Sequence, residues 1–134
     1  MAKYAYAAVF SEDENGRFSV NFPDLEGCYT CGDDLKDALM MAKDVLAYVL
    51  YDYEREGKKI PEPSNPEDIK FTNGEFVNFV ACDTMDYRKM HNNRAVKKTL
   101  TIPGWLNEAA LSMGLNFSQV LQEALVERVN YHRP

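Results

Sequence analysis

The residues with the clearest chemical pattern lie in segment 96–102, where hydroxyl and basic side chains alternate with mainly apolar ones. Such alternation is typical of a β-strand whose two faces meet different surroundings. One face would carry Lys97, Thr99 and Thr101. Lysine can donate to guanine in the DNA major groove, and threonine can bond a base edge or contact a thymine methyl group. The segment therefore predicts a strand that contacts nucleic acid.

The elements around this strand are marked by breaks in the chain. Pro103 ends the strand and suits the first turn of a helix, which Gly114 would end. The sequence Asn-Phe-Ser-Gln at 116–119 resembles a capping box that starts a second helix, with the asparagine side chain accepting from the glutamine amide. Free amides near Asn116 and Ser118 would offer a site for a phosphate group.

A strand followed by two short helices does not form a stable module alone. Segment 96–134 is under about forty residues long, and its strand has no partner strand within the module. Two copies solve both problems, because the strands can pair antiparallel while four helices close around one apolar core. We expect a homodimer or a higher oligomer whose core contains Leu100, Ile102, Trp105, Leu121 and Leu125.

Charge is distributed unevenly along the chain. Residues 1–87 carry 8 Lys and Arg against 18 Asp and Glu, a net charge of −10. Residues 88–134 carry 7 Lys and Arg against 3 acids, a net charge of +4, and together the two parts give the −6 of the whole chain. This asymmetry favours a nucleic-acid-binding tail on an acidic body. The acidic body would suit a basic protein partner.

The acidic part has the pattern of a small α+β domain. Segments 4–10, 17–22 and 75–82 show the aromatic, β-branched or alternating residues of strands, and 28–30 could be a short strand. Asn15-Gly16 would supply the two positive-φ residues of a tight hairpin turn between the first two strands.

A long amphipathic helix should follow the third strand. We expect Asp33 to cap it, and the helix to run to about Glu56 and stop at Gly57. The order β-β-β-α-β gives one sheet covered on one face by one helix. We therefore expect an α+β domain over 1–83, a linker that could be helical over 84–95, and the strand-helix-helix module over 96–134.

Other groups that could do chemistry have simpler explanations. Cys28 and Cys31 form a C-x-x-C pair before a helix, but Asp33 and Asp34 beside them oppose a thiolate. A zinc site would need a second pair of ligands close in sequence, and none is present. We expect the three cysteines to be free thiols with a structural role.

The sequence also speaks against an enzyme. The predicted strands carry no acid in their interiors, whereas two-metal hydrolysis needs clustered carboxylates. Neither His91 nor His132 has a nucleophile near it in sequence. We expect no catalytic residue, no metal and no cofactor. Because the start has no signal-peptide core and no apolar run approaches the roughly 20 residues of a membrane span, we expect a cytoplasmic protein with no membrane partner.

The C-terminal module resembles the ribbon-helix-helix family of DNA-binding proteins. The residues that carry the resemblance are Lys97-Lys98-Thr99-Leu100-Thr101-Ile102-Pro103, Gly114 and Asn116-Phe117-Ser118. It implies that a two-stranded ribbon, formed by a dimer, docks in the major groove. The expected DNA contacts are Lys97, Thr99, Thr101, Asn116 and Ser118.

The segment after the first hairpin resembles the corresponding motif of HicB-family antitoxins. It reads Phe22-Pro23-Asp24-Leu25-Glu26-Gly27-Cys28-Tyr29-Thr30-Cys31-Gly32-Asp33 and leads into an Ala- and Leu-rich helix. The resemblance covers nearly the whole chain and implies a partial RNase H-like domain joined to a ribbon-helix-helix module. It further implies that the body blocks a HicA-type toxin, a small basic mRNA-cleaving ribonuclease, and that the module represses the operon through operator DNA.

The toxin contacts are not fixed by this motif. From position and charge in a loop expected to be exposed, the candidates are Asp24, Glu26 and Tyr29. Three other interpretations stay open. The chain could be a stand-alone ribbon-helix-helix transcriptional regulator whose acidic domain senses a ligand or binds a partner. It could be an interaction protein whose C-terminal module only dimerises, or a redox enzyme based on Cys28 and Cys31.

Overall fold

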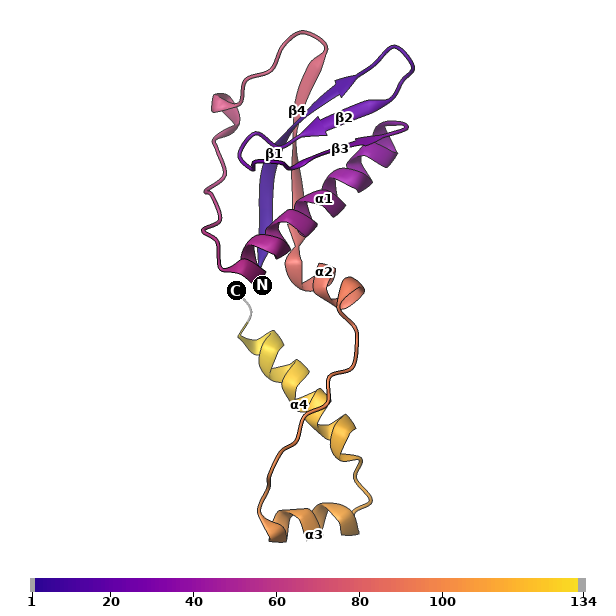
Figure 1. Ribbon diagram of the computed structural model, residues 1–134, viewed down its shortest axis with the longest axis vertical. Helices are drawn as coiled ribbons and strands as arrows, with labels where there is room; N and C mark the ends of the chain where they lie inside the picture. Colours follow the sequence, from indigo (N-terminus) through magenta and orange to yellow (C-terminus); the bar gives the residue numbers. More distant parts are fainter. Residues whose placement is uncertain (1, 133–134) are drawn as a thin grey trace. The chain divides into compact units, whose positions relative to one another are not determined.

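The computed structural model describes residues 2–132. The chain divides into two compact units, with the boundary between Asn93 and Arg94. Figure 1 shows a sheet with one long helix against it in the first unit, and two helices joined by a turn in the second. In the described residues, no helix is both long and apolar enough to cross a membrane.

The first unit is built on a four-stranded antiparallel sheet. Its strands are β1 (Lys3–Glu12), β2 (Phe18–Asn21), β3 (Tyr29–Gly32) and β4 (Glu75–Asp83). They lie in the order β3-β2-β1-β4, so β3 and β4 form the two edges. Val9 at the middle of the sheet pairs with Asn21 on one side and Val77 on the other. Along the chain, the predicted order of elements β-β-β-α-β is confirmed.

The turn between β1 and β2 differs from the expected tight hairpin. Gly16 has a positive φ of 81°, but Asn15 does not, since the described residues other than glycine all have negative φ. The Asp13 carboxylate instead accepts hydrogen bonds from the backbone N–H groups of Asn15 and Arg17, both at 2.9 Å. The connection is therefore a longer loop held by an aspartate side chain, which satisfies the backbone donors locally.

Helix α1 (Leu35–Glu56) covers one face of the sheet. Its cap is Asp34 rather than the expected Asp33, because Asp34 Oδ1 accepts from the N–H of Asp37 at 2.8 Å. Gly57 ends the helix with a φ of 69°, as the sequence predicted. The helix packs on the sheet through buried residues of one face: Ala38, Ala42, Leu46, Ala47 and Leu50.

The first turns of α1 lie very close to β3. A Cβ atom added to Gly32 would lie 2.3 Å from the backbone nitrogen of Ala38, which is closer than real Cβ atoms approach. Glycine at this position therefore permits the close contact between strand and helix. The chain can then turn directly from β3 into α1, and the helix lies flat on a core that includes Tyr6, Phe10 and Phe22.

A long loop over residues 57–74 is attached to the rest of the first unit at three points. The Tyr6 hydroxyl donates to the carbonyl of Pro61. The Asp24 carboxylate accepts from both the backbone N–H and the hydroxyl of Ser64. Ile69 follows the short 3-10 helix η1 (Pro66–Asp68) and is buried against Ala7 and Val9, on the sheet face opposite to α1. The loop therefore covers part of the second face.

Residues 84–91, expected to belong to a linker, form helix α2 (Thr84–His91). Asp83 caps α2 by accepting from the N–H of Met85 at 2.9 Å. The helix packs against α1, and the ring of Tyr87 stacks on that of His91 at 4.2 Å between centroids. Helix α2 is therefore part of the first unit.

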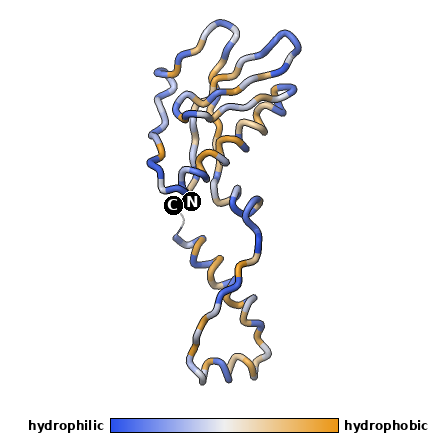
Figure 2. Tube along the Cα trace, in the orientation of Figure 1, coloured by the Kyte–Doolittle hydropathy of each residue, from blue (hydrophilic) through white to orange (hydrophobic). Residues whose placement is uncertain are grey.

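The second unit contains α3 (Gly104–Ser112) and α4 (Phe117–Tyr131). Residues 92–103 form neither helix nor strand, so the strand expected over 96–102 is not present in the single chain. A strand exists through hydrogen bonds to a neighbouring strand, and no strand elsewhere in the described part of the chain pairs with this segment. In Figure 2, apolar residues recur along α3 and α4 as they do in the first unit.

Candidate nucleic-acid interface

The segment expected to contact DNA is extended and open to solvent. Lys97, Thr99 and Thr101 are exposed. The apolar residues that alternate with the threonines are exposed too, Leu100 by 62% and Ile102 by 49%. Both sets of side chains are therefore available, one for a ligand and the other for a protein surface.

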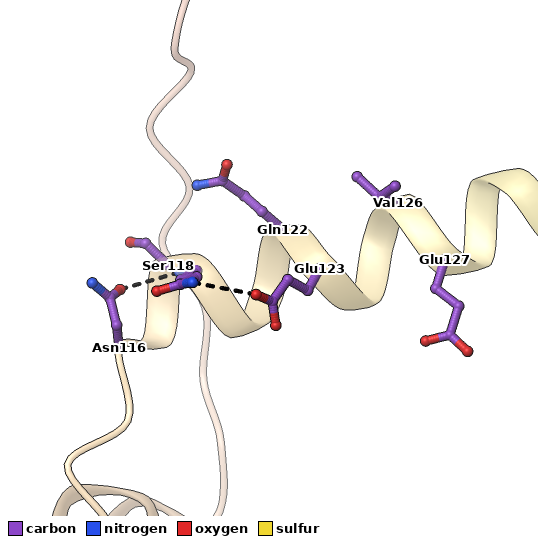
Figure 3. A pocket seen from close by; sticks show the side chains of 7 residues that line it. Asn116, Ser118, Gln122, Glu123, Val126 and Glu127 are labelled. Atoms are coloured by element: carbon purple, nitrogen blue, oxygen red, sulfur yellow. Dashed lines mark hydrogen bonds between the residues drawn. The ribbon is translucent and has the colours of Figure 1, made fainter.

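The start of α4 has the predicted cap. Asn116 Oδ1 accepts from the N–H of Gln119 at 3.1 Å, which confirms the sequence-based prediction. Figure 3 shows Asn116 and Ser118 at this end of the helix. Ser118 is exposed in the first turn, where backbone N–H groups lack helical partners and can bind an anion.

A shallow hollow along α4 starts at the same place. The side chains that Figure 3 draws around it include Glu123 and Glu127, and Gln119 Nε2 donates to Glu123 Oε1 at 3.3 Å. Two carboxylates repel a phosphate, so only the capped end of the helix, near Asn116 and Ser118, fits an anionic backbone.

The residues predicted to form a dimer core have no cover in the single chain. Trp105 is 71% exposed and Leu125 54%, while Leu121 is half-buried. Between residues 94 and 132, the structure contains no buried side chain. The second unit thus has two helices, of which α4 is capped by Asn116, but its described residues form no hydrophobic core, although it carries many large apolar residues.

The three candidate partner contacts of the first unit differ in their surroundings. Glu26 is exposed, and Tyr29 is 69% exposed at the start of β3. Asp24 was expected to be exposed, but it is half-buried, and both of its carboxylate oxygens accept from Ser64. The correction has a simple cause: the loop over 57–74 lies against the Asp24 turn, and a sequence does not show that contact.

The cysteines do not form a reactive pair. Cys28 is buried, and burial raises the pKa of its thiol to about 12, which keeps it protonated. Cys31 is exposed and its sulfur lies 4.0 Å from Arg17 Nη2. In residues 2–132, the structure brings no group of three or more His, Cys, Asp or Glu side chains together as a metal site.

The main polar cluster of the first unit was missed in the sequence. The Glu54 carboxylate accepts from the Tyr4 hydroxyl at 2.7 Å, from the Thr84 hydroxyl at 3.1 Å and from Arg88 Nη1 at 2.7 Å. Burial by itself would raise the pKa of Glu54, but hydrogen bonds to the carboxylate, including these three, lower it to about 2. One signal was available: Glu54 lies one helical turn after Leu50, on the buried face of α1.

A groove of about 660 Å³ between α1 and α2 was also missed. Its walls include the exposed side chains of Met40 and Met90 together with Tyr87. Its charges are mixed, with Lys43 and Asp44 contributed by α1. No local pattern indicated this groove, because it forms only where α2 packs against α1.

Comparison with known proteins relates this chain to one family, through a family model and through individual proteins. The family model described as "HicB_like antitoxin of bacterial toxin-antitoxin system" matches residues 5–72. A curated relative, Antitoxin HicB 2 of Photorhabdus laumondii, is 39% identical over 59 residues, which cover 44% of this chain and 42% of the relative.

Two solved structures resemble the chain over most of its length. One, described as a toxin–antitoxin complex from Streptococcus pneumoniae, has 29% sequence identity and a TM-score of 0.58 over 94% of this chain and 99% of that chain. The other, described as the crystal structure of antitoxin HicB3, has 26% identity and a TM-score of 0.52 over 94% and 98%. The mixed α+β architecture described above is therefore shared with solved antitoxins.

Proposed function

Because this chain belongs to the HicB-like antitoxin family of bacterial toxin–antitoxin systems, we propose that it neutralises a HicA-type toxin by direct binding and represses its own operon through DNA binding. The first unit binds the toxin. The second unit dimerises and docks on operator DNA as a ribbon-helix-helix module. The role is regulatory and requires no catalytic residue, metal or cofactor.

The observation that carries the DNA-binding half is the second unit's lack of a core. A unit without buried side chains does not offset the conformational entropy lost on folding. A second copy supplies what is absent: segment 96–102 gains a partner strand, and the exposed Leu100, Ile102 and Trp105 gain cover. The same pairing places Lys97, Thr99 and Thr101 of both copies on one outward face of a two-stranded ribbon.

The toxin-binding half rests on charge and on family membership. Residues 1–87 carry a net charge of −10, which suits the basic surface of a ribonuclease that binds RNA. A solved structure with a similar fold is described as a toxin–antitoxin complex. Glu26 and Tyr29 remain candidate contacts because both are exposed, in the loop before β3 and at the start of β3.

The experiment that tests this function measures the affinity of the same protein for two ligands, operator DNA and the toxin. Fluorescence anisotropy measures the affinity of the chain for the DNA upstream of its own gene, against scrambled DNA, and calorimetry measures its affinity for the HicA-type toxin of the same genome. Thr99→Ala should weaken binding to the upstream DNA by about 1–3 kcal/mol and leave toxin binding unchanged.

The outcomes separate the interpretations. Loss of both affinities in Thr99→Ala would contradict the division of labour between the units. A dimer with no DNA affinity even at low salt would reduce the second unit to a dimerisation module. DNA binding that responds to a small ligand, without toxin binding, would favour a stand-alone regulator.

A further inference from the structure

Strand β4 presents a long backbone edge that has no hydrogen-bond partner among residues 2–132. It forms one edge of the sheet, and its ladder to β1 runs without interruption from Glu75 to Asp83. Among the described residues, no backbone hydrogen bond joins residues 76–82 to a loop or to another strand. Every second N–H and C=O of this segment therefore points away from β1 with no protein partner.

The usual protections of an edge strand are absent from β4. Residues 76–82 contain no proline, no glycine and no charged side chain. The continuous register with β1 leaves no room for a bulge. Apolar side chains are exposed on both faces, Phe76 by 39% and Phe79 by 43%. A strand of this kind is a template for a strand from another chain.

The charges at the two ends of β4 favour one kind of partner strand over another. A second copy pairing antiparallel about Phe79 would place Glu75 of one copy opposite Asp83 of the other, at both ends of the pair. Like charges directly opposite each other destabilise a strand pair. A strand from a basic protein, with Lys or Arg along it and at its ends, would instead meet a carboxylate at each end. The surrounding unit is strongly acidic, which also attracts a basic protein and repels a copy of itself.

We propose that the edge of β4 binds an antiparallel or parallel strand of the basic toxin, so that the sheets of the two proteins become continuous. This inference rests on the proposed function and adds the place and manner of docking. Main-chain hydrogen bonds along residues 76–82 supply the affinity, and the terminal carboxylates of Glu75 and Asp83 supply the preference for a basic partner.

Two substitutions at one exposed position test the edge. Asn78 lies in the middle of β4 and its side chain is exposed. Asn78→Lys places a positive charge against the basic partner and should weaken toxin binding about tenfold or more, whereas Asn78→Asp should leave it equal or stronger. The matched control is Asn65→Lys in the loop over 57–74, where the exposed side chain makes no capping bond, and this variant should bind the toxin as the wild type does.

Hydrogen exchange of the full chain, alone and mixed with the HicA-type toxin, gives a direct readout of strand addition. In the free chain the outward amides of residues 76–82 should exchange quickly, and in the complex they should slow by at least about tenfold. A complex in which these amides are unchanged would overturn the proposal and leave the antitoxin function intact. Absence of any complex would instead contradict the proposed function itself.

The same measurement tests the competing occupant. If the outward amides of β4 become protected without toxin as the chain concentration rises, a second copy occupies the edge, and the assignment to the toxin is wrong. An unchanged toxin affinity in Asn78→Lys would also overturn the proposal. It would show that no basic strand lies against the middle of the β4 edge.

Discussion

Arg88 in α2 donates from Nη1 to Glu54 Oε1 in α1 at 2.7 Å, and both side chains are mostly buried. The same carboxylate accepts from Tyr4 at the start of β1 and from Thr84 at the start of α2. One acidic side chain therefore holds together the beginning of the sheet, the end of the long helix and the short helix that follows the sheet.

This cluster should make the first unit sensitive to acid. The folded pKa of Glu54 lies at about 2, below its ordinary value of 4.5, so its stabilising effect is complete above pH 4.5 and is lost as the pH falls towards 2. After allowance for partial solvent screening, we expect the wild type to lose about 2 kcal/mol over this range from Glu54 alone. Urea unfolding followed by circular dichroism at several pH values measures the loss.

The Glu54→Gln variant isolates that contribution. It should be less stable than the wild type at pH 7 and lose less stability on acidification, because an amide does not titrate and bonds Arg88 without charge. Glu56→Gln, at the exposed end of the same helix, is the matched control and should follow the wild type. Equal pH dependence in Glu54→Gln and the wild type would show that other carboxylates dominate acid unfolding.

Close packing of β3 on α1 predicts a strong effect at Gly32. Gly32→Ala would place a methyl group 2.3 Å from the Ala38 nitrogen and force the strand and helix apart, at a cost of about 1–3 kcal/mol. Gly104→Ala is the control, since nothing lies within 4 Å of an added Cβ there. Thermal unfolding compares the two. An unaltered melting temperature for Gly32→Ala would mean that the strand can shift without loss.

The loop over 57–74 should depend on Asp24. Asp24→Ala removes the acceptor of two hydrogen bonds from Ser64, so the loop should exchange its amides faster, with a loss of about 1–2 kcal/mol in stability. Ser64→Ala keeps the backbone donor and should have the smaller effect. Hydrogen exchange by mass spectrometry resolves this segment, and slower or unchanged exchange in Asp24→Ala would contradict its role as the anchor.

The single tryptophan can report on dimerisation. Trp105 is 71% exposed in one chain, and the proposed dimer buries it. We expect its fluorescence maximum to move to longer wavelength on dilution, as the dimer dissociates. Leu100→Asp would put a charge into the dimer core and should give the long-wavelength spectrum at every concentration. A maximum independent of both dilution and Leu100→Asp would argue against burial of Trp105 by a second copy.

A phosphate contact by Lys97 should be visible in the salt dependence of DNA binding. Lys97→Ala is expected to lower the slope of log affinity against log salt by about 1 for each copy of Lys97 that meets a phosphate. Lys36→Ala, an exposed lysine of α1, removes the same charge from the first unit and should leave the slope unchanged. A slope unaltered by Lys97→Ala would assign that lysine a base contact or no contact.

Local signals in the sequence predicted the elements well. Aromatic and apolar runs predicted β1 and β4, alternation predicted β2, and the Asn116 cap was identified down to its hydrogen bond with Gln119. The cap of α1 was displaced by one residue, because two adjacent aspartates, Asp33 and Asp34, both fit the position.

The remaining differences involve contacts between distant parts of the chain. Asp24 meets Ser64 and Glu54 meets Arg88 only after the loop and α2 have packed, and no local pattern records such pairs. Segment 96–102 is a further case, because the strand predicted there is not present in the single chain, and a strand requires hydrogen bonds to a neighbouring strand. Lys97, Thr99 and Thr101 could be named as DNA contacts from alternation alone, whereas the ribbon proposed for them requires a second copy.

Arg88 of α2 donates a hydrogen bond to Glu54 of α1, so α2 belongs with the first unit. The position at which one C-terminal module can be replaced by another therefore lies after Asn93 rather than after residue 83. A natural recombination event or a laboratory chimera could join a different C-terminal module at residue 83. Such a junction removes Thr84 and Arg88, and the Glu54 carboxylate then loses two of its hydrogen-bond donors. A junction after Asn93 keeps the first unit complete. The first unit is thus a portable segment about ten residues longer than its strands and long helix suggest.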